Sequence, residues 1–164
     1  MPDSIPEPLD AQRILEELAR HEVDFVLVGG LAAQTHGNTR MTNDVDVIPA
    51  PEPDNLARLA TALHALDARV LNPGHEEIQI EASMLPRATI WQFATRHGDI
   101  DVLHEAPGAA PYPELRERAL VIALDGTRVQ VAGLDDLIRM KLARGRTVDR
   151  ADVAALTGPE AQAR

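Results

Sequence analysis

Two aspartates, Asp44 and Asp46, are separated by one residue within a predicted short strand that ends at Pro49. Side chains alternate along a strand, so the two carboxylates would share one face while Val45 and Val47 enter the core. The aspartates would lie roughly 6.5 Å apart along the strand, which lets both bind one divalent ion or a pair of ions. Alone, such a pattern is also typical of a solvated strand face.

A glycine pair, Gly29-Gly30, directly follows the apolar run 25–28, which has the length and composition of a buried strand. Glycine lets the backbone turn sharply and approach a ligand closely. Residues 31–36 can form a short helix that stops at Gly37. The N–H groups at the start of such a helix lack partners within it, which suits phosphate. A lone Gly-Gly is usually only a turn, but beside the aspartates it predicts a phosphate-binding turn next to a carboxylate metal site.

A third carboxylate comes from a predicted pair of strands, residues 88–96 and 99–103, joined by a tight turn at His97-Gly98. In the second strand Asp99 and Asp101 would share one face, and the apolar residues between them the other. An acidic residue in mid-strand needs a partner, and a metal shared with the two earlier aspartates would provide one. Asp101 is favoured over Asp99, which lies closer to the turn.

The order of strand, glycine pair, short helix and Asp-x-Asp resembles the nucleotidyltransferase superfamily of DNA polymerase β. The segment 40–46 is similar to its bacterial single-domain members, which include minimal nucleotidyltransferases and those of abortive-infection and toxin–antitoxin systems. The run 141–152 resembles the C-terminal motif of this bacterial family, in which the lysine and the acidic residues close the nucleotide cleft. Gly30 stands where many relatives have serine, which removes one side-chain contact to the phosphate.

The resemblance implies a polymerase β-like α/β (α+β) fold with a mixed, mostly antiparallel sheet and helices mainly on one side. An NTP would be the co-substrate and Mg²⁺ or Mn²⁺ the metal, with Asp101 also a candidate base for the acceptor hydroxyl. The implied catalytic residues are Asp44, Asp46, Asp101 and Lys141, and the three aspartates are the implied metal ligands. The candidate nucleotide-binding residues are Gly29, Gly30, Arg40, Thr42, Arg146 and Asp152.

Lys141 is the only lysine of the chain, and it ends the apolar stripe of a helix predicted to begin near residue 134. Lysine is a compact point charge that suits a phosphate. The alternative is a structural ion pair between Lys141 and Asp152. Residues 137–150 contain five cations and one anion, a basic patch that would bind a triphosphate or an RNA backbone, or form a solvated helix face.

Composition excludes several classes of function. The 164 residues are 45% apolar and predict one domain, residues 9–157, between mobile tails at 1–8 and 158–164. The absence of cysteine excludes disulfides, thiolate catalysis and cysteine zinc sites. Neither Ser4 nor Ser83 lies in a nucleophile elbow. A net charge of −10 disfavours general nucleic-acid binding. The sequence has neither a membrane-span run nor a secretory leader pattern, so we predict a cytoplasmic protein with no membrane partner.

The remaining elements follow from periodicity and capping signals. We predict a helix over 10–20 capped by Asp10, a helix from Asp54 to about residue 68 capped by Asp54, a weak edge strand at 78–80, a short helix from Tyr112, a hairpin of 120–124 with 127–131, and a helix capped by Asp135.

The acceptor is the least determined part of the prediction. By resemblance, a macromolecule, either tRNA or a partner protein, ranks first, and a cognate toxin or antitoxin would be a further partner. A small molecule such as an antibiotic ranks second. A non-catalytic antitoxin or binding module that keeps the fold is the alternative from another class.

Overall fold

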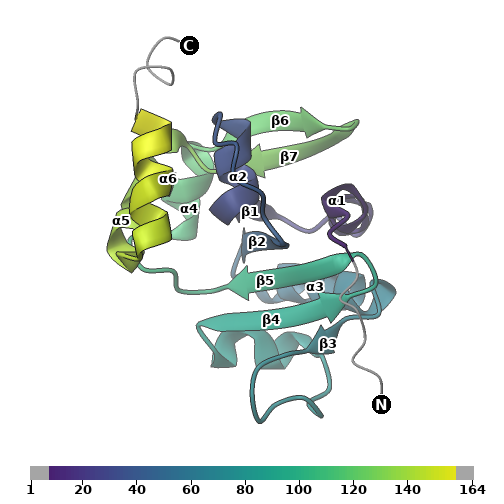
Figure 1. Cartoon of the computed structure of the whole chain (residues 1–164). Helices are drawn as coiled ribbons and strands as arrows, with labels where there is room; N and C mark the ends of the chain where they lie inside the picture. The colour runs from purple at the N-terminus through teal and green to yellow at the C-terminus, as the bar shows by residue number, and fades with distance from the viewer. Residues whose placement is uncertain (1–7, 158–164) are drawn as a thin grey trace.

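The apolar run 25–28 forms β1 (Phe25–Val28), a fully buried strand within a seven-stranded sheet (Figure 1). The computed structural model describes residues 8–157, and all counts here refer to that range. The other strands are β2 (Asp44–Pro49), β3 (Arg69–Val70), β4 (Ile90–Thr95), β5 (Gly98–Leu103), β6 (Leu120–Leu124) and β7 (Thr127–Val131). The helices are α1 (Ala11–Arg20), α2 (Gly29–Thr35), α3 (Pro53–Ala65), α4 (Tyr112–Glu117), α5 (Leu134–Arg144) and α6 (Thr147–Thr157), with a 3-10 helix η1 (Ala82–Arg87).

The strand order is β3-β4-β5-β2-β1-β7-β6. Strand β1 pairs antiparallel with β2 and parallel with β7, and β2 pairs parallel with β5. The other three pairs, β3 with β4, β4 with β5 and β6 with β7, are antiparallel. The prediction of an α/β fold on a mixed, mostly antiparallel sheet is therefore confirmed.

Alternation along the central strands separates the core from the site. Val45, Val47, Ile100 and Val102 are fully buried, and helices α1 and α3 contact each other and contribute buried leucines to the same core. Burial of each such side chain contributes about 1.5–3 kcal/mol. Because neighbouring residues of a strand point to opposite faces, the aspartates of β2 and β5 emerge on the face away from these valines.

Several helix starts differ from the prediction. Helix α1 is capped by Asp10 as expected, since Asp10 accepts a hydrogen bond from the backbone N–H of Arg13. Helix α3 instead begins at Pro53, because proline suits the first helical position. The predicted cap Asp54 was wrong: it lies inside the first turn, and Glu52 is the N-cap.

Helix α3 also ends earlier than predicted, at Ala65, and Asp67 just beyond it has a positive φ of 52°. The predicted cap Asp135 of α5 was wrong as well. Gly133 precedes the helix in an extended conformation, and both Asp135 and Asp136 lie in the first turn, where acidic side chains complement the helix dipole.

Residues 70–90 and the following turn also differ from the prediction. No strand forms at 78–80; instead the carbonyl of Ile80 bonds to His64 Nε2 at 2.7 Å, and η1 follows. The turn between β4 and β5 is Arg96-His97 rather than His97-Gly98, because Thr95 pairs with Gly98. The predicted tails, 1–8 and 158–164, lie outside the described residues except for Pro8, and the domain bounds stay a prediction. No helix within residues 8–157 is long and apolar enough to cross a membrane.

Candidate functional site

The parallel pairing of β2 with β5 brings the predicted carboxylates together. Its register places Asp46 opposite Asp101 and Asp44 opposite Asp99. Carboxylate oxygens of Asp44, Asp46 and Asp101 lie within 4.8 Å of one another. Asp101 is only 7% exposed, whereas Asp99 is exposed and lies outside the group. The three aspartates singled out in the sequence are thus neighbours in space, and their functional roles remain a prediction.

This cluster of like charges perturbs its own ionisation. Burial, followed by the charge of Asp44, raises the pKa of Asp46 to about 6. Burial also raises the pKa of Asp101 to about 8, with the charges of Asp46 and Asp44 adding to the effect. Two neighbouring carboxylates resist simultaneous ionisation, so the group tends to keep a proton. A divalent cation would relieve this repulsion, and three carboxylates are the hard oxygen ligands that Mg²⁺, Mn²⁺ and Ca²⁺ prefer.

The glycine pair lies directly against these carboxylates. Gly29 has a positive φ of 71°, and a Cβ added there would overlap with the carboxylate of Asp46. A Cβ on Gly30 would lie 2.9 Å from Thr42 Oγ1. Both glycines belong to the first turn of α2, which begins at Gly29 rather than at residue 31 as predicted. The glycines therefore make room for the neighbouring aspartate and threonine, a purpose that the sequence alone did not indicate.

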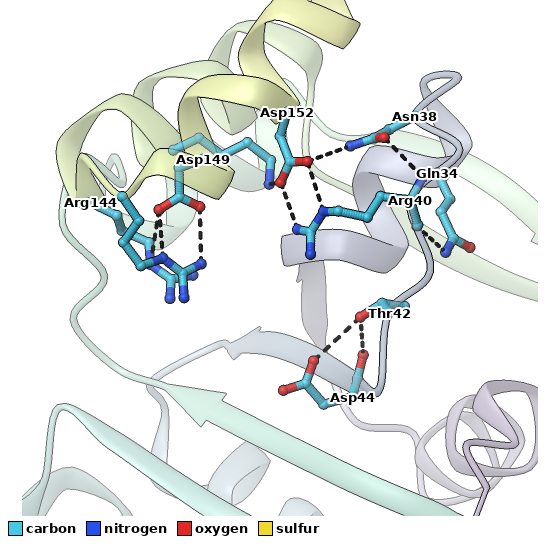
Figure 2. A network of polar contacts seen from close by, with 10 residues as sticks. Gln34, Asn38, Arg40, Thr42, Asp44, Arg144, Asp149 and Asp152 are labelled. Atoms are coloured by element: carbon cyan, nitrogen blue, oxygen red, sulfur yellow. Dashed lines mark hydrogen bonds and ion pairs between the residues drawn. The ribbon is translucent and has the colours of Figure 1, made fainter.

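Thr42 connects the loop before β2 to the carboxylate cluster. Its hydroxyl bonds to the backbone carbonyl of Asp44 at 3.2 Å and lies 3.4 Å from Asp44 Oδ1 (Figure 2). This contact holds the loop against the start of β2. Thr42, predicted to bind nucleotide, thus lies beside a predicted metal ligand.

A second cluster, which we call the Asp152 cluster, consists of Asn38, Arg40, Lys141 and Asp152. Arg40 donates two hydrogen bonds to Asp152, Nε to Oδ1 at 2.9 Å and Nη2 to Oδ2 at 2.7 Å. Lys141 Nζ lies 2.8 Å from Asp152 Oδ2, and Asn38 Nδ2 lies 3.1 Å from Oδ1. Figure 2 shows Asn38 and Arg40 pointing at Asp152 from the loop after α2. The ion pair between Lys141 and Asp152, which the sequence left as an alternative, is present.

Ionisation of Asp152 follows from these donors. Burial alone would raise the pKa of Asp152, but the hydrogen bonds from Arg40, Lys141 and Asn38 outweigh burial and hold that pKa well below its usual range. The carboxylate is therefore charged at any pH near neutrality. It joins α5 and α6 to the loop that leads into β2.

The basic patch predicted over 137–150 is largely neutralised by acidic side chains. Arg146 donates two hydrogen bonds to buried Asp149 at 2.7 and 3.0 Å, and Arg144 Nε lies 4.0 Å from Asp149 Oδ2. Arg139 lies 3.7 Å from Asp136, and Lys141 is bound to Asp152. Because Asp136 and Asp152 stand just outside the counted window, the sequence count overstated the local positive charge.

A cavity of about 280 Å³ opens beside the carboxylates. Its polar wall includes Gly29, Asp46, Asp101, Lys141 and Arg144, and its apolar wall comes from β4, β5, the loop after β5, and α5. The predicted site residues that do not line it are Gly30, Arg40, Thr42, Asp44, Arg146 and Asp152.

Sequence reasoning missed two residues of this region. Arg144 entered the prediction only as one charge of the basic patch, although its position three residues after Lys141 places both on one helix face. Asn38 carries no pattern of its own, because its partner Asp152 is 114 residues away.

A comparison with family models matches residues 9–157 to a family described as "Nucleotidyltransferase of unknown function (DUF6036)". A comparison with proteins of curated function found no match.

Solved structures with a similar fold include three proteins. The antibiotic-resistance factor ANT(2'')-Ia is 18% identical, with a TM-score of 0.59 over 92% of this chain and 83% of its own. A putative nucleotidyltransferase from Thermotoga maritima is 15% identical, with a TM-score of 0.57 over 86% of this chain and 85% of its own. An antigenic nucleotidyltransferase-like protein from Paracoccidioides brasiliensis is 15% identical, with a TM-score of 0.57 over 95% of this chain and 87% of its own. At these identities the likeness supports the fold.

Proposed function

The chain belongs to the DUF6036 family of nucleotidyltransferases and is an enzyme of that class, and we propose that it moves a nucleoside monophosphate from an NTP to a hydroxyl group and releases pyrophosphate. The observation that carries this proposal is the convergence of Asp44, Asp46 and Asp101 within 4.8 Å beside a cavity. Three carboxylates gathered on one sheet face are costly without a cation, and their arrangement suits a reaction on a metal-bound triphosphate.

The three aspartates would hold Mg²⁺ or Mn²⁺. Such ions, when bound, stabilise negative charge on the attacking and leaving oxygens of a phosphoryl displacement. The donor set fits a hard divalent cation because all three side chains offer oxygen. By the resemblance, Asp101 is also the candidate base for the acceptor hydroxyl.

Cations that line the cavity would bind the triphosphate. Lys141 and Arg144 line the cavity from α5, and Asp46 and Asp101 line the same cavity. Lys141 shares Asp152 with Arg40, so these three side chains together keep one positive charge. We assign Lys141 to charge neutralisation during transfer.

The remaining nucleotide contacts are proposed from the resemblance. The backbone N–H groups of Gly29 and Gly30 would bind phosphate oxygens. The other proposed nucleotide-binding residues are Arg40, Thr42, Arg146 and Asp152. Arg40 and Arg146 are already bonded to carboxylates. They would contact the triphosphate only if it displaced those carboxylates, and would otherwise hold neighbouring residues in place.

The proposed acceptor is a macromolecule, either tRNA or a partner protein, in a toxin–antitoxin setting. Met41 supports this choice: it lies between Arg40 and Thr42 and is 81% exposed. A large apolar side chain exposed beside a candidate active site is a suitable contact for a partner surface. Leu142, next to Lys141, is a second exposed apolar residue of this kind.

A small-molecule acceptor is the second candidate. A structure of ANT(2'')-Ia in complex with adenylyl-2''-tobramycin has a TM-score of 0.55 to this chain at 15% identity. The cavity of about 280 Å³ beside the carboxylates is near the lower end of the size of small-molecule sites, roughly 300–1,000 Å³.

The test is incubation of the purified chain with each labelled NTP, Mg²⁺ or Mn²⁺, and one of three acceptor pools. The pools are total RNA, lysate protein and a panel of antibiotics. We expect label to enter the RNA or the protein pool, and the Asp44→Asn/Asp46→Asn variant to transfer none. Label in the antibiotic pool alone would favour the second candidate, and no transfer to any pool would favour a non-catalytic binding module.

A further inference from the structure

The two edges of the sheet differ in character. Strand β3 is only two residues long and includes the exposed Arg69, and short, charged edge strands resist pairing with other chains. Strand β6 at the opposite edge is the run Leu-Val-Ile-Ala-Leu over residues 120–124, without charge or proline. Figure 1 shows the β6–β7 hairpin projecting from the rest of the molecule, with β6 outermost. Among residues 8–157 no segment pairs with the free side of β6.

Apolar side chains of β6 are incompletely covered. Leu120 is 49% exposed and Val121 is 55% exposed. Ile122 and Leu124 are partly buried against the core, on the same face as the buried β7 valines. The apolar face of the sheet therefore continues to its edge, where further burial would stabilise it.

The turn of this hairpin determines which backbone groups are free. Asp125 and Gly126 both have positive φ, 49° and 86°, as in a type I′ turn. The residue pair that flanks such a turn, 124 with 127, exchanges backbone hydrogen bonds. Away from the turn, non-hydrogen-bonded and hydrogen-bonded pairs then alternate along the two strands. Residues 120, 122 and 124 therefore bond to β7. The N–H and C=O groups of Val121 and Ala123 point away from β7.

We propose that β6 pairs with β6 of a second copy of this chain, antiparallel about a two-fold axis at Ile122. In this register Val121 lies opposite the second copy's Ala123, so both residues with free backbone groups exchange hydrogen bonds. Ile122 lies opposite its own counterpart, and Leu120 lies opposite the second copy's Leu124. The two sheets become one continuous sheet.

A second copy fits this edge better than a different partner does. Every position of the five-residue strand meets an apolar residue when the strand is paired with itself, so neither an unpaired charge nor a polar group is buried. Each chain carries a net charge of −10, and two copies would repel least where they meet at an uncharged strand. Salt should therefore strengthen the dimer, because it screens the remaining repulsion.

Engineered cysteines test the register, because the chain has no cysteine of its own. The two-fold axis places residue 122 opposite itself in a non-hydrogen-bonded pair, with Cα atoms about 4.5 Å apart, within disulfide reach. Residue 121 meets its own counterpart only diagonally, at about 7–8 Å, which is beyond that reach. Under mild oxidation Ile122→Cys should form a covalent dimer much faster than Val121→Cys. Equal rates, or no dimer from Ile122→Cys, would overturn the proposal.

Sedimentation of the unmodified chain provides a second test that does not depend on those variants. We expect a species of twice 17.8 kDa whose share grows with protein and salt concentration. Val121→Lys places a charge at the edge and should give a monomer, because the side chain is already exposed and the fold tolerates the change. Leu71→Lys, a similarly exposed apolar residue at the opposite end of the sheet, should remain dimeric. An unmodified chain that stays monomeric at every concentration and salt would refute the pairing.

Discussion

Asp101→Asn removes one of the three clustered carboxyl groups and keeps the size of the side chain. In the metal-free protein, burial and the charges of Asp46 and Asp44 raise the pKa of Asp101 from 3.8 to about 8. Between these values the folded protein holds a proton that the unfolded chain has released. The free energy of unfolding must therefore fall as the pH rises through this range, and the variant must lack this part of the loss.

The size of the effect follows from linkage. A group that is protonated when folded and ionised when unfolded changes stability by about 1.4 kcal/mol per pH unit. Between about pH 5 and pH 7, Asp101 alone should cost the metal-free protein about 3 kcal/mol. Asp46, whose pKa is raised to about 6, adds to the fall up to that pH. Burial lowers the pKa of His104, and this makes stability rise with pH. The parent is therefore compared with the variant, in which His104 is unchanged.

The assay is urea unfolding with a chelator present, at several pH values in this range. The parent should lose about 3 kcal/mol more than Asp101→Asn between the two ends. Added Mg²⁺ should stabilise the parent by mass action and leave the variant unchanged. Asp99→Asn, in the exposed neighbour on the same strand, is the matched control and should keep the response to Mg²⁺. Parallel pH curves for parent and Asp101→Asn, or equal stabilisation of both by Mg²⁺, would refute the reasoning.

Further variants test the supporting residues. Gly29→Ala should lose metal binding and nucleotide transfer, because the added Cβ would overlap with the carboxylate of Asp46. The control is Gly74→Ala, at a positive φ of 82° with no atom within 4 Å of the added Cβ. This control should lose only stability, about 1–2 kcal/mol by urea unfolding. Asp152→Ala should lower the free energy of unfolding by about 3–5 kcal/mol, because it leaves Lys141 as a buried charge without its carboxylate partner. An unfolding free energy within about 1 kcal/mol of the parent's would contradict this. Lys141→Met should change the free energy of unfolding by no more than about 1 kcal/mol, because other donors still bond to Asp152. The same variant should abolish transfer in the labelling assay. Transfer at the parent rate would remove Lys141 from the site.

Patterns of short range predicted six of the seven strands, all but the two-residue β3, together with the carboxylate cluster. Alternation along β2 and β5 assigned the faces of Asp44, Asp46 and Asp101 correctly, because the two-residue period of a strand leaves little freedom. The Asp-Gly turn and the pairing of β6 with β7 followed for the same local reason. The spacing of Lys141 and Asp152 was enough to suggest their contact as an alternative.

Features that depend on distant partners could not be predicted. Asp136 lies in the first turn of α5 and accepts two hydrogen bonds from Arg118, 18 residues before it, and nothing near Asp136 in the sequence indicates that bond. The approach of Arg40 to Asp152 spans 112 residues. For Gly29 the sequence indicates only a phosphate contact. The closeness of Asp46 to Gly29 could not be predicted, because it arises only when β1 and β2 pair.

The position of the transferred label tests the central claim most directly. The chain is incubated with Mg²⁺, its acceptor pool, and an NTP labelled at either the α- or the γ-phosphate. Nucleotidyl transfer predicts that only the α-label enters the acceptor, that the γ-label leaves as pyrophosphate, and that Asp44→Asn/Asp46→Asn transfers neither. Entry of the γ-label into the acceptor, or undiminished transfer of the α-label by the double variant, would contradict the account.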